Sequence, residues 1–358
     1  MEFRGRSAVA IENEAIRATM LVGGGHIAEI TLKEQGVNPL WIPPWKGMEP
    51  SQFDPKEHRG YGSGAEARLL AGIMGHNLCF DFFGPPSEEE AAAGLTVHGE
   101  ASVVDWEITP AGDAELRAAA ELPLAGMRVE RRLRLPPGAR VLLITETAEN
   151  LTATDRAVGW TQHVTMGPPF VAPGRTVFHL PATRSKVFEG DFAEGKGRMK
   201  IGAEFDWPFC PATDGGVIDL RVAAPEAPAS AGYTAHLLDP SREQAFFAAY
   251  NQDLGVLFGY AWRRADFPWL GIWEENRARE HPPWNGRTIT RGMEFGVSPM
   301  PETRRQMIDR GTMFDTPCYR WIPARGRVTV EYYAFIEASD RLPAMDPTAW
   351  LGSVPTAS

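Results

Sequence analysis

The chain has 358 residues, of which 43% are hydrophobic and 23% charged, and its formal net charge is −10. This composition is ordinary for a globular protein. Basic residues are interleaved with acidic ones and form no basic stripe, so we expect no nucleic-acid partner. No stretch has the apolar run that a membrane span needs, so we expect no membrane partner either.

The cysteines and the N-terminus indicate the compartment. Cys79, Cys210 and Cys318 are odd in number and lack metal-ligand or redox spacing, so buried free thiols are expected. The first residues, MEFRGRSAVAIENEAIRA, contain no apolar core of signal-peptide length. Together these features predict a cytoplasmic protein.

The pattern along the chain predicts short strands almost throughout. Runs of β-branched or alternating residues end at turn residues, and 36 Gly and 30 Pro are scattered among them. Short helices are expected at 87–93 and 302–310. The predicted fold class is therefore all-β. In chain order, the predicted strands cover 7–11, 16–22, 26–32, 101–108, 116–122, 127–135, 140–149, 158–165, 217–222, 233–238, 243–250, 254–262, 269–273, 288–295 and 327–336.

No linker or internal repeat divides the chain, so we expect one domain over 1–358, with a core at about 7–337 and a tail after about 340. Residues 41–70 break the strand pattern and are rich in Pro, Gly and aromatic residues. Long loops of this kind are often lids or binding loops. The alternative is that Trp41 and Trp45 simply pack on the surface.

Polar residues in apolar surroundings are the candidates for chemistry. They are His98 in VHGEA, His163 in TQHVTM, Asp206 in EFDWPF and Glu294 in RGMEFGVSP. A carboxylate in an apolar strand costs free energy unless it is paired or functional, and it suits a general base. The alternatives are that Glu294 faces solvent or pairs with Arg291, and that the histidines are structural.

Other common sites are missing from the sequence. It has no HExxH or HxH metal spacing, no GxGxxG after a strand, no phosphate-binding P-loop and no GxSxG elbow. We therefore expect no metal and no organic cofactor. The later chain is rich in indoles, including Trp273, which either stack on sugar rings or fill the core.

Several segments occur in a consistent order along residues 25–336. They are GHIAEITLKEQGVNPLW, GHNLCFDFFG, LTVHGEASVVDW, ENLTATDRAVGWTQHVTMGPPF, FDWPF, EFGVSP and WIPARGRVTVEYYAF. In this order they resemble the galactose mutarotase (aldose 1-epimerase) superfamily. The resemblance implies a β-supersandwich, in which stacked antiparallel sheets carry a concave sugar-binding cleft.

The resemblance also implies a reaction, the interconversion of the anomers of a free aldose or sugar derivative by ring opening. Glu294 would be the general base and His163 the general acid, with a small-molecule sugar as the partner and no cofactor. The other implied contacts with the sugar come from His98, Asp206, Asn77, His76 and Trp273.

Departures from the family pattern leave alternatives open. Leu78 stands where the family has an arginine, which His76 could replace, and Gly296 stands at the family's glutamine position. A non-catalytic carbohydrate-binding protein on the same scaffold is therefore the alternative function. Glu274 and Glu275 are alternative bases, and Glu274 with Glu294 could supply the two carboxylates of a glycosidase. The sequence names neither the sugar nor the oligomeric state.

Overall fold

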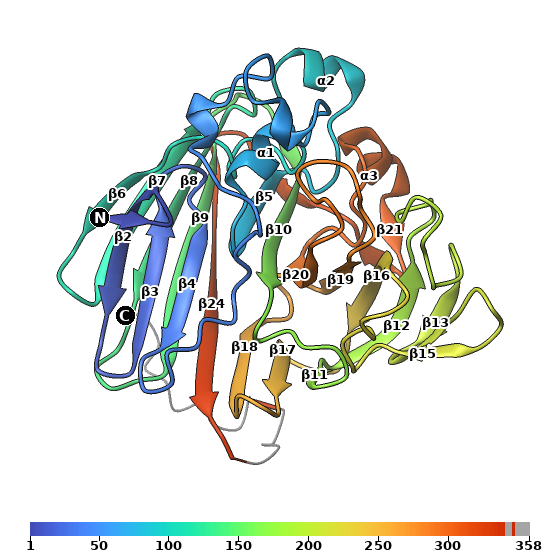
Figure 1. Ribbon diagram of the computed structural model, residues 1–358. Coiled ribbons are helices and arrows are strands. Elements are labelled where there is room, and N and C mark those ends of the chain that lie inside the picture. Colours follow the sequence, from blue (N-terminus) through green and yellow to red (C-terminus); the bar gives the residue numbers. More distant parts are fainter. Residues whose placement is uncertain (341–345, 348–358) are drawn as a thin grey trace.

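Two large antiparallel sheets carry most of the regular structure in the part of the chain that the computed structural model describes (Figure 1). The described residues are 1–340 and 346–347. The predicted all-β class is therefore confirmed. Most of the tail predicted after about residue 340 lies outside the described residues.

The first sheet contains twelve strands within the described residues, and it carries the residues of greatest interest. Eleven of them follow one another in space, and β23 pairs with β10 beside this path. In spatial order, the strands are β1 (Glu2–Phe3), β2 (Arg6–Glu12), β3 (Ile16–Leu21), β4 (Ile27–Leu32), β5 (His76–Asp81), β10 (Arg156–Met166), β20 (Ile289–Gly296), β19 (Trp269–Asn276), β16 (Ser230–Leu238), β12 (Ala182–Val187) and β13 (Glu204–Asp206), with β23 (Arg320–Ile322).

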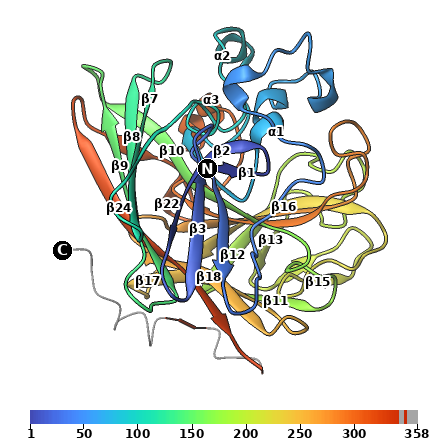
Figure 2. The same cartoon turned by 60° about the vertical axis from the view of Figure 1, so that its left-hand side comes forward.

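The second sheet has eight strands among the described residues. Their spatial order is β11 (Thr176–His179), β17 (Gln244–Asn251), β18 (Val256–Arg263), β24 (Arg327–Ala338), β9 (Val141–Asn150), β8 (Met127–Arg134), β7 (Glu115–Leu122) and β6 (Glu107–Pro110). Two small hairpins pair β14 (Phe209–Pro211) with β15 (Val217–Asp219), and β21 (Thr312–Met313) with β22 (Thr316–Pro317). Figure 2 shows β7, β8, β9 and β24 together on one side of the molecule, with β12, β13 and β16 on the other.

The helices are short and lie in the connections between strands. They are α1 (Ala67–Gly72), α2 (Glu88–Ala92) and α3 (Arg304–Arg310), with single 3-10 turns η1 (Pro50–Gln52) and η2 (Arg59–Tyr61). Both predicted helices are confirmed, and each begins with a capping box, from Ser87 in α2 and from Thr303 in α3. The strand predicted at 101–108 is correct only at its end, because the amides of Val103 and Val104 bond back to Glu100 as a turn.

The core lies between the two sheets. Alternate residues of each strand point to opposite faces, so one face of each sheet supplies the core. For example, β3 contributes Met20 and β8 contributes Val129 and Leu133 to one continuous apolar cluster.

A buried polar cluster lies in this core, on the side of β10 that faces the second sheet. Arg131 and Glu146 form an ion pair of 2.6 Å between side chains with no exposed surface. The side-chain amide of Gln162 donates to Glu146 over 2.6 Å, and its oxygen accepts from Nε2 of His76 over 2.9 Å and from Tyr332 over 2.9 Å. Each polar group thereby has a partner, as burial requires. The cluster fixes the face of β10 that is opposite His163.

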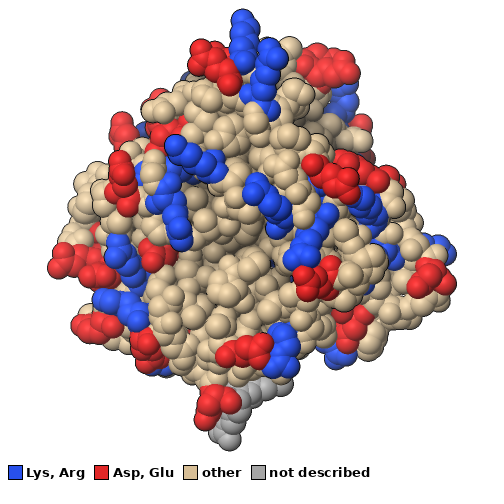
Figure 3. All heavy atoms as spheres, in the orientation of Figure 1, with Lys and Arg blue, Asp and Glu red and all other residues tan. Residues whose placement is uncertain are grey.

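The outer surface carries charges of both signs. On the face shown in Figure 3, Lys and Arg side chains alternate with Asp and Glu side chains. Among the described residues, no helix combines the length and the apolar character that crossing a bilayer requires.

Candidate active site

The central strands of the first sheet bring His163 and Glu294 together. β10 and β20 are antiparallel neighbours, and His163 is paired directly with Glu294 in their register. Directly paired residues point to the same face of a sheet and have Cβ atoms about 4.5–5.5 Å apart. Gly271 of β19 is paired with Glu294 on its other side, and the side chain of Tyr233 occupies the space over this glycine.

The two side chains are in contact. Nε2 of His163 lies 3.0 Å from Oε1 of Glu294, and the two side chains are 6% and 2% exposed. This Glu294 oxygen receives no well-aligned hydrogen bond from any residue in the described part of the chain. Nδ1 of His163 lies 2.9 Å from Oγ1 of Thr165, two residues along the same strand. The imidazole is thus held at Nδ1, and its Nε2 faces the carboxylate.

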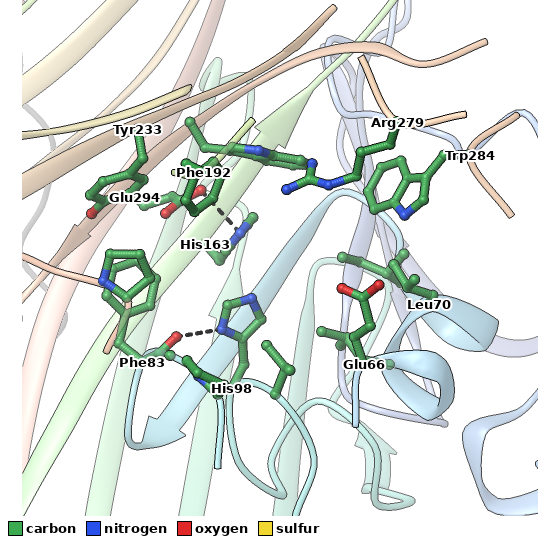
Figure 4. Close-up of a pocket in the computed structure, with 17 residues that line it drawn as sticks. Glu66, Leu70, Phe83, His98, His163, Phe192, Tyr233, Arg279, Trp284 and Glu294 are labelled. Carbon is green, nitrogen blue, oxygen red and sulfur yellow. Dashed lines mark hydrogen bonds and ion pairs between the residues drawn. The ribbon is translucent and has the colours of Figure 1, made fainter. Parts of the chain in front are cut away.

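His98 completes a group of two imidazoles and one carboxylate (Figure 4). Its ring centroid lies 5.0 Å from that of His163. Nδ1 of His98 donates to the carbonyl of Phe83 over 2.5 Å, since a carbonyl only accepts. Burial, and to a lesser extent His163, lowers the pKa of His98 to about 3. Neutral His98 therefore presents an unprotonated Nε2 that can accept a hydrogen bond.

These residues line a pocket of about 240 Å³. Ligand pockets for drug-sized molecules span about 300–1,000 Å³, so this volume suits one small ring. Segment 41–70 supplies part of the wall through Glu66, Leu69 and Leu70. The full lining is Glu66, Leu69, Leu70, Ile73, Phe83, Gly84, Pro85, Val97, His98, His163, Phe192, Tyr233, Trp273, Arg279, Trp284, Glu294 and Pro301.

Tryptophans join segment 41–70 to the pocket. Trp41 stacks on Trp284 with ring centroids 6.2 Å apart, and Trp45 meets Trp284 edge-on at 5.2 Å. Trp273 lies 6.0 Å from Trp284 and 5.8 Å from the ring of His163. Trp41 and Trp45 therefore pack together, but Trp41 is buried and does not lie on the surface as the alternative interpretation predicted. The same segment also forms a pocket wall.

The pocket contains unused hydrogen-bonding groups. The indole nitrogens of Trp273 and Trp284 are buried and donate to no described residue, and the two residues are only 6% and 3% exposed. On the acceptor side are Oε1 of Glu294 and Nε2 of His98. Buried polar groups normally have partners, so a ligand with several donors and acceptors would satisfy this pocket.

The structure places other sequence-predicted residues elsewhere. Asp206 is exposed on the edge strand β13, where it is the register partner of Arg184 in β12. It does not line the pocket. His76 is paired with Val164 and faces the core, where it bonds to Gln162 and Tyr260. The structure therefore does not bring Asp206 and His76 into this pocket, contrary to the expectation that they lie with the other site residues.

Asn77 lies beside the pocket. It is paired with His163 across β5 and β10, so it shares that face of the sheet. It is fully buried, is not part of the pocket lining, and its amide atoms have no partner among the described residues. Trp273, by contrast, lines the pocket.

The two departures from the family pattern have structural explanations. Leu78 is paired with Gln162 and is part of the core between the sheets, so a longer side chain there would point away from the pocket. At Gly296 a Cβ atom would lie 2.6 Å from the carbonyl oxygen of Trp160 and 2.5 Å from Oγ1 of Thr161. Position 296 therefore has no room for glutamine.

Some pocket residues gave no sequence signal. Glu66 and Arg279 both line the pocket, yet each lies in a polar loop sequence that resembles many surface segments.

The alternative bases do not line the pocket. Glu274 lies 3.5 Å from Arg291 on the other face of β19, and Glu275 forms an ion pair with Arg279. Among the described residues, no group of three or more His, Cys, Asp or Glu side chains is arranged to hold a metal ion.

Solved structures share this architecture over nearly the whole chain. A proposed aldose 1-epimerase from Klebsiella pneumoniae subsp. pneumoniae superposes with a TM-score of 0.62 at 14% identity, over 91% of this chain and 77% of that one. A galactose mutarotase-like protein from Clostridium acetobutylicum gives 0.61 at 12% identity, over 94% and 97%. The chain has the galactose mutarotase-like fold.

A proposed aldose 1-epimerase from Escherichia coli K12 gives the same result, with a TM-score of 0.61 at 13% identity over 93% of this chain and all of that one (100%). The resemblance to the galactose mutarotase superfamily is thus confirmed at the level of the fold. No protein-family model matches the chain, and no curated protein matches its sequence.

Proposed function

We propose that the protein is a sugar mutarotase or epimerase that interconverts the anomers of a free aldose. The observation that carries this proposal is the contact of 3.0 Å between Nε2 of His163 and Oε1 of Glu294 inside a pocket sized for one ring. General acid–base catalysis needs a donor and an acceptor of protons within reach of one substrate. A protonated imidazole and a carboxylate are such a pair.

Ring opening requires two proton transfers. Glu294 takes the proton of the anomeric hydroxyl, the C1–O5 bond breaks, and His163 gives a proton to O5. The product is the open-chain aldehyde. After rotation about C1–C2, His163 takes the proton back from the O5 hydroxyl, O5 attacks the other face of C1, and Glu294 returns its proton to O1. Both residues end in their starting states, and each transfer contributes about 10²–10⁴-fold to the rate.

The surroundings of the pair suit a hydroxylated ring. Trp273 lies beside His163 and offers an apolar face for the C–H groups of a sugar, while its free indole N–H can donate to a hydroxyl. Neutral His98 can accept from another hydroxyl through Nε2. Two proteins of this fold are described as proposed aldose 1-epimerases.

A panel of α-anomers tests the proposal. Nuclear magnetic resonance exchange spectroscopy measures how fast α and β forms interconvert with and without the full chain. Acceleration over buffer for at least one aldose is the expected result. Binding without acceleration would instead favour the non-catalytic carbohydrate-binding protein, and new reducing ends or unsaturated products would indicate hydrolase or lyase chemistry.

A further inference from the structure

Arg279 is a pocket residue that the proposed ring-opening steps do not use. It lies in the loop after β19, and Figure 4 shows its side chain extending across one side of the pocket between Phe192 and Trp284. The guanidinium carbon lies 5.4 Å from the ring centroid of Phe192 and 5.1 Å from that of Trp284. Such packing favours arginine, whose flat cation stacks on aromatic faces.

One end of this guanidinium is fixed by a buried carboxylate. Nη1 of Arg279 donates to Oε2 of Glu275 over 2.6 Å. The remaining nitrogens, Nε and Nη2, donate to no residue within the described ranges. Arg279 is therefore oriented by the protein and keeps donors for a ligand.

Glu275 forms an ion pair with Arg279 and also accepts from two backbone amides. Burial raises its pKa, but Oε1 accepts from the amides of Ala278 over 2.6 Å and Arg279 over 3.1 Å, in addition to the bond from Arg279 Nη1. Donors directed at a carboxylate favour its charged form. The positive charge of Arg279 is thus already balanced by Glu275.

The opposite side of the pocket carries negative charge. Figure 4 shows the Glu66 carboxylate across the pocket from Arg279. Glu66 is half-buried and forms no ion pair with any residue that the structure describes. Glu294 adds a second carboxylate, and His98 is neutral. In the proposed mechanism a protonated His163 balances the charge of Glu294, as Glu275 balances that of Arg279. A bound anion would therefore meet repulsion from Glu66 with little compensating attraction from Arg279.

We infer, on the basis of the proposed function, that Arg279 is a specificity-determining residue that donates hydrogen bonds to hydroxyls of the sugar, and that Glu275 restricts this contact to uncharged sugars. The pocket then selects aldoses over the matching uronic acids and sugar phosphates. Two features cause this selection: Glu66 repels an anionic sugar, and Glu275 neutralises the positive charge of Arg279.

The test uses the full chain and matched sets of sugars, each an aldohexose with its uronic acid and its 6-phosphate. Dissociation constants are measured by calorimetry for the wild type and for Arg279→Gln, Glu275→Gln and Arg279→Lys. Arg287→Gln, an exposed arginine of the same loop, is the matched control. Thermal unfolding confirms that each variant is folded.

The wild type should bind the aldose at least tenfold more tightly than its acidic forms. Arg279→Gln should weaken aldose binding at least tenfold, with partial rescue in Arg279→Lys and no change in Arg287→Gln. Glu275→Gln keeps an oxygen that accepts from the two amides but loses the negative charge. The ratio between the dissociation constants of the uronic acid and the aldose should therefore fall at least tenfold. If Glu275 had only a structural role, its replacement would weaken the binding of both sugars and leave the ratio of their dissociation constants unchanged.

Tighter binding of an acidic sugar by the wild type, or unchanged aldose binding by Arg279→Gln, would overturn the inference while leaving ring opening intact. Failure of every sugar in the panel to bind the wild type would instead contradict the proposed function itself, and the inference with it.

Discussion

His163 and Glu294 occupy directly paired positions on β10 and β20, 131 residues apart in the chain, and their Nε2 and Oε1 atoms lie 3.0 Å apart. The register of two antiparallel strands is enough to place them on one face of the sheet. A shift of one residue would turn one of them toward the core. The buried cluster around Gln162, the neighbour of His163, opposes such a shift.

Removing either member of the pair should abolish acceleration of anomer exchange. Glu294→Gln and His163→Asn are each expected to lower the rate constant by about 10²–10⁴-fold, because each removes one proton transfer. Exchange spectroscopy measures the rate. Glu204→Gln, an exposed glutamate of β13, is the control and should match the wild type. Equal rates in Glu294→Gln and the control would remove Glu294 from the mechanism.

Gly292 should control the position of the Glu294 carboxylate. A Cβ atom at position 292 would lie 2.3 Å from Oε1 of Glu294, which is the flexible end of a side chain. Gly292→Ala should therefore displace the carboxylate and reduce turnover at least tenfold, with little loss of stability. Gly296→Ala meets backbone instead and should destabilise the fold by about 1–3 kcal/mol. Urea unfolding and exchange rates distinguish the two, and reversed effects would contradict this explanation.

Stability should fall as the pH is lowered below neutral. Burial lowers the pKa values of His26, His98 and His236 to about 3, whereas the unfolded value is near 6.5. The unfolded chain therefore binds protons between pH 6.5 and 3 that the folded chain does not, so stability present above pH 6.5 is lost as the pH falls toward 3.

At pH 5 each such histidine costs about 2 kcal/mol of unfolding free energy. His98 has a positive φ of 69°, which asparagine also tolerates. His98→Asn should thus lose less stability than the wild type between pH 7.5 and pH 5, as measured by urea unfolding at both values. An identical loss in both proteins would mean that His98 is not held neutral by burial.

Substitutions of Glu66 and Asp206 test whether the sugar binds in the pocket that the structure shows or at the site that the sequence predicted. Glu66→Gln should change the affinity for a bound sugar because Glu66 lines the pocket, whereas Asp206→Asn should not because Asp206 is exposed on β13. Calorimetry with an aldose that the wild type binds measures both. A loss of affinity in Asp206→Asn alone would place the binding site elsewhere.

The fold could be predicted because most strands carry their own pattern. Alternation in 127–135 and 116–122 is enough to predict β8 and β7. His163 and Glu294 could also be singled out, because Glu294 interrupts an apolar strand and both residues lie in segments that resemble the family pattern.

The face of a residue in β5 could not be predicted in the same way. All six residues of this strand are buried, so its sequence does not show that Asn77 and His76 point to opposite faces. The register with β10 decides this, and register depends on contacts distant in sequence.

The remaining pocket residues depend on tertiary packing. The aromatic residues around Asp206 pack into a separate apolar cluster with Cys210 and Leu220, which takes this motif away from the pocket. Arg279 becomes a pocket residue only because Glu275 and Trp284 hold it there. Nothing in the local sequence of either segment encodes that placement.

A crystal structure of Glu294→Gln with a bound aldose tests the central claim most directly. We predict a single ring in the pocket, with O5 within hydrogen-bonding distance of Nε2 of His163 and the anomeric hydroxyl next to the side chain at position 294. A sugar bound at another surface, or a ring whose C1 and O5 both lie out of reach of these two side chains, would contradict the account.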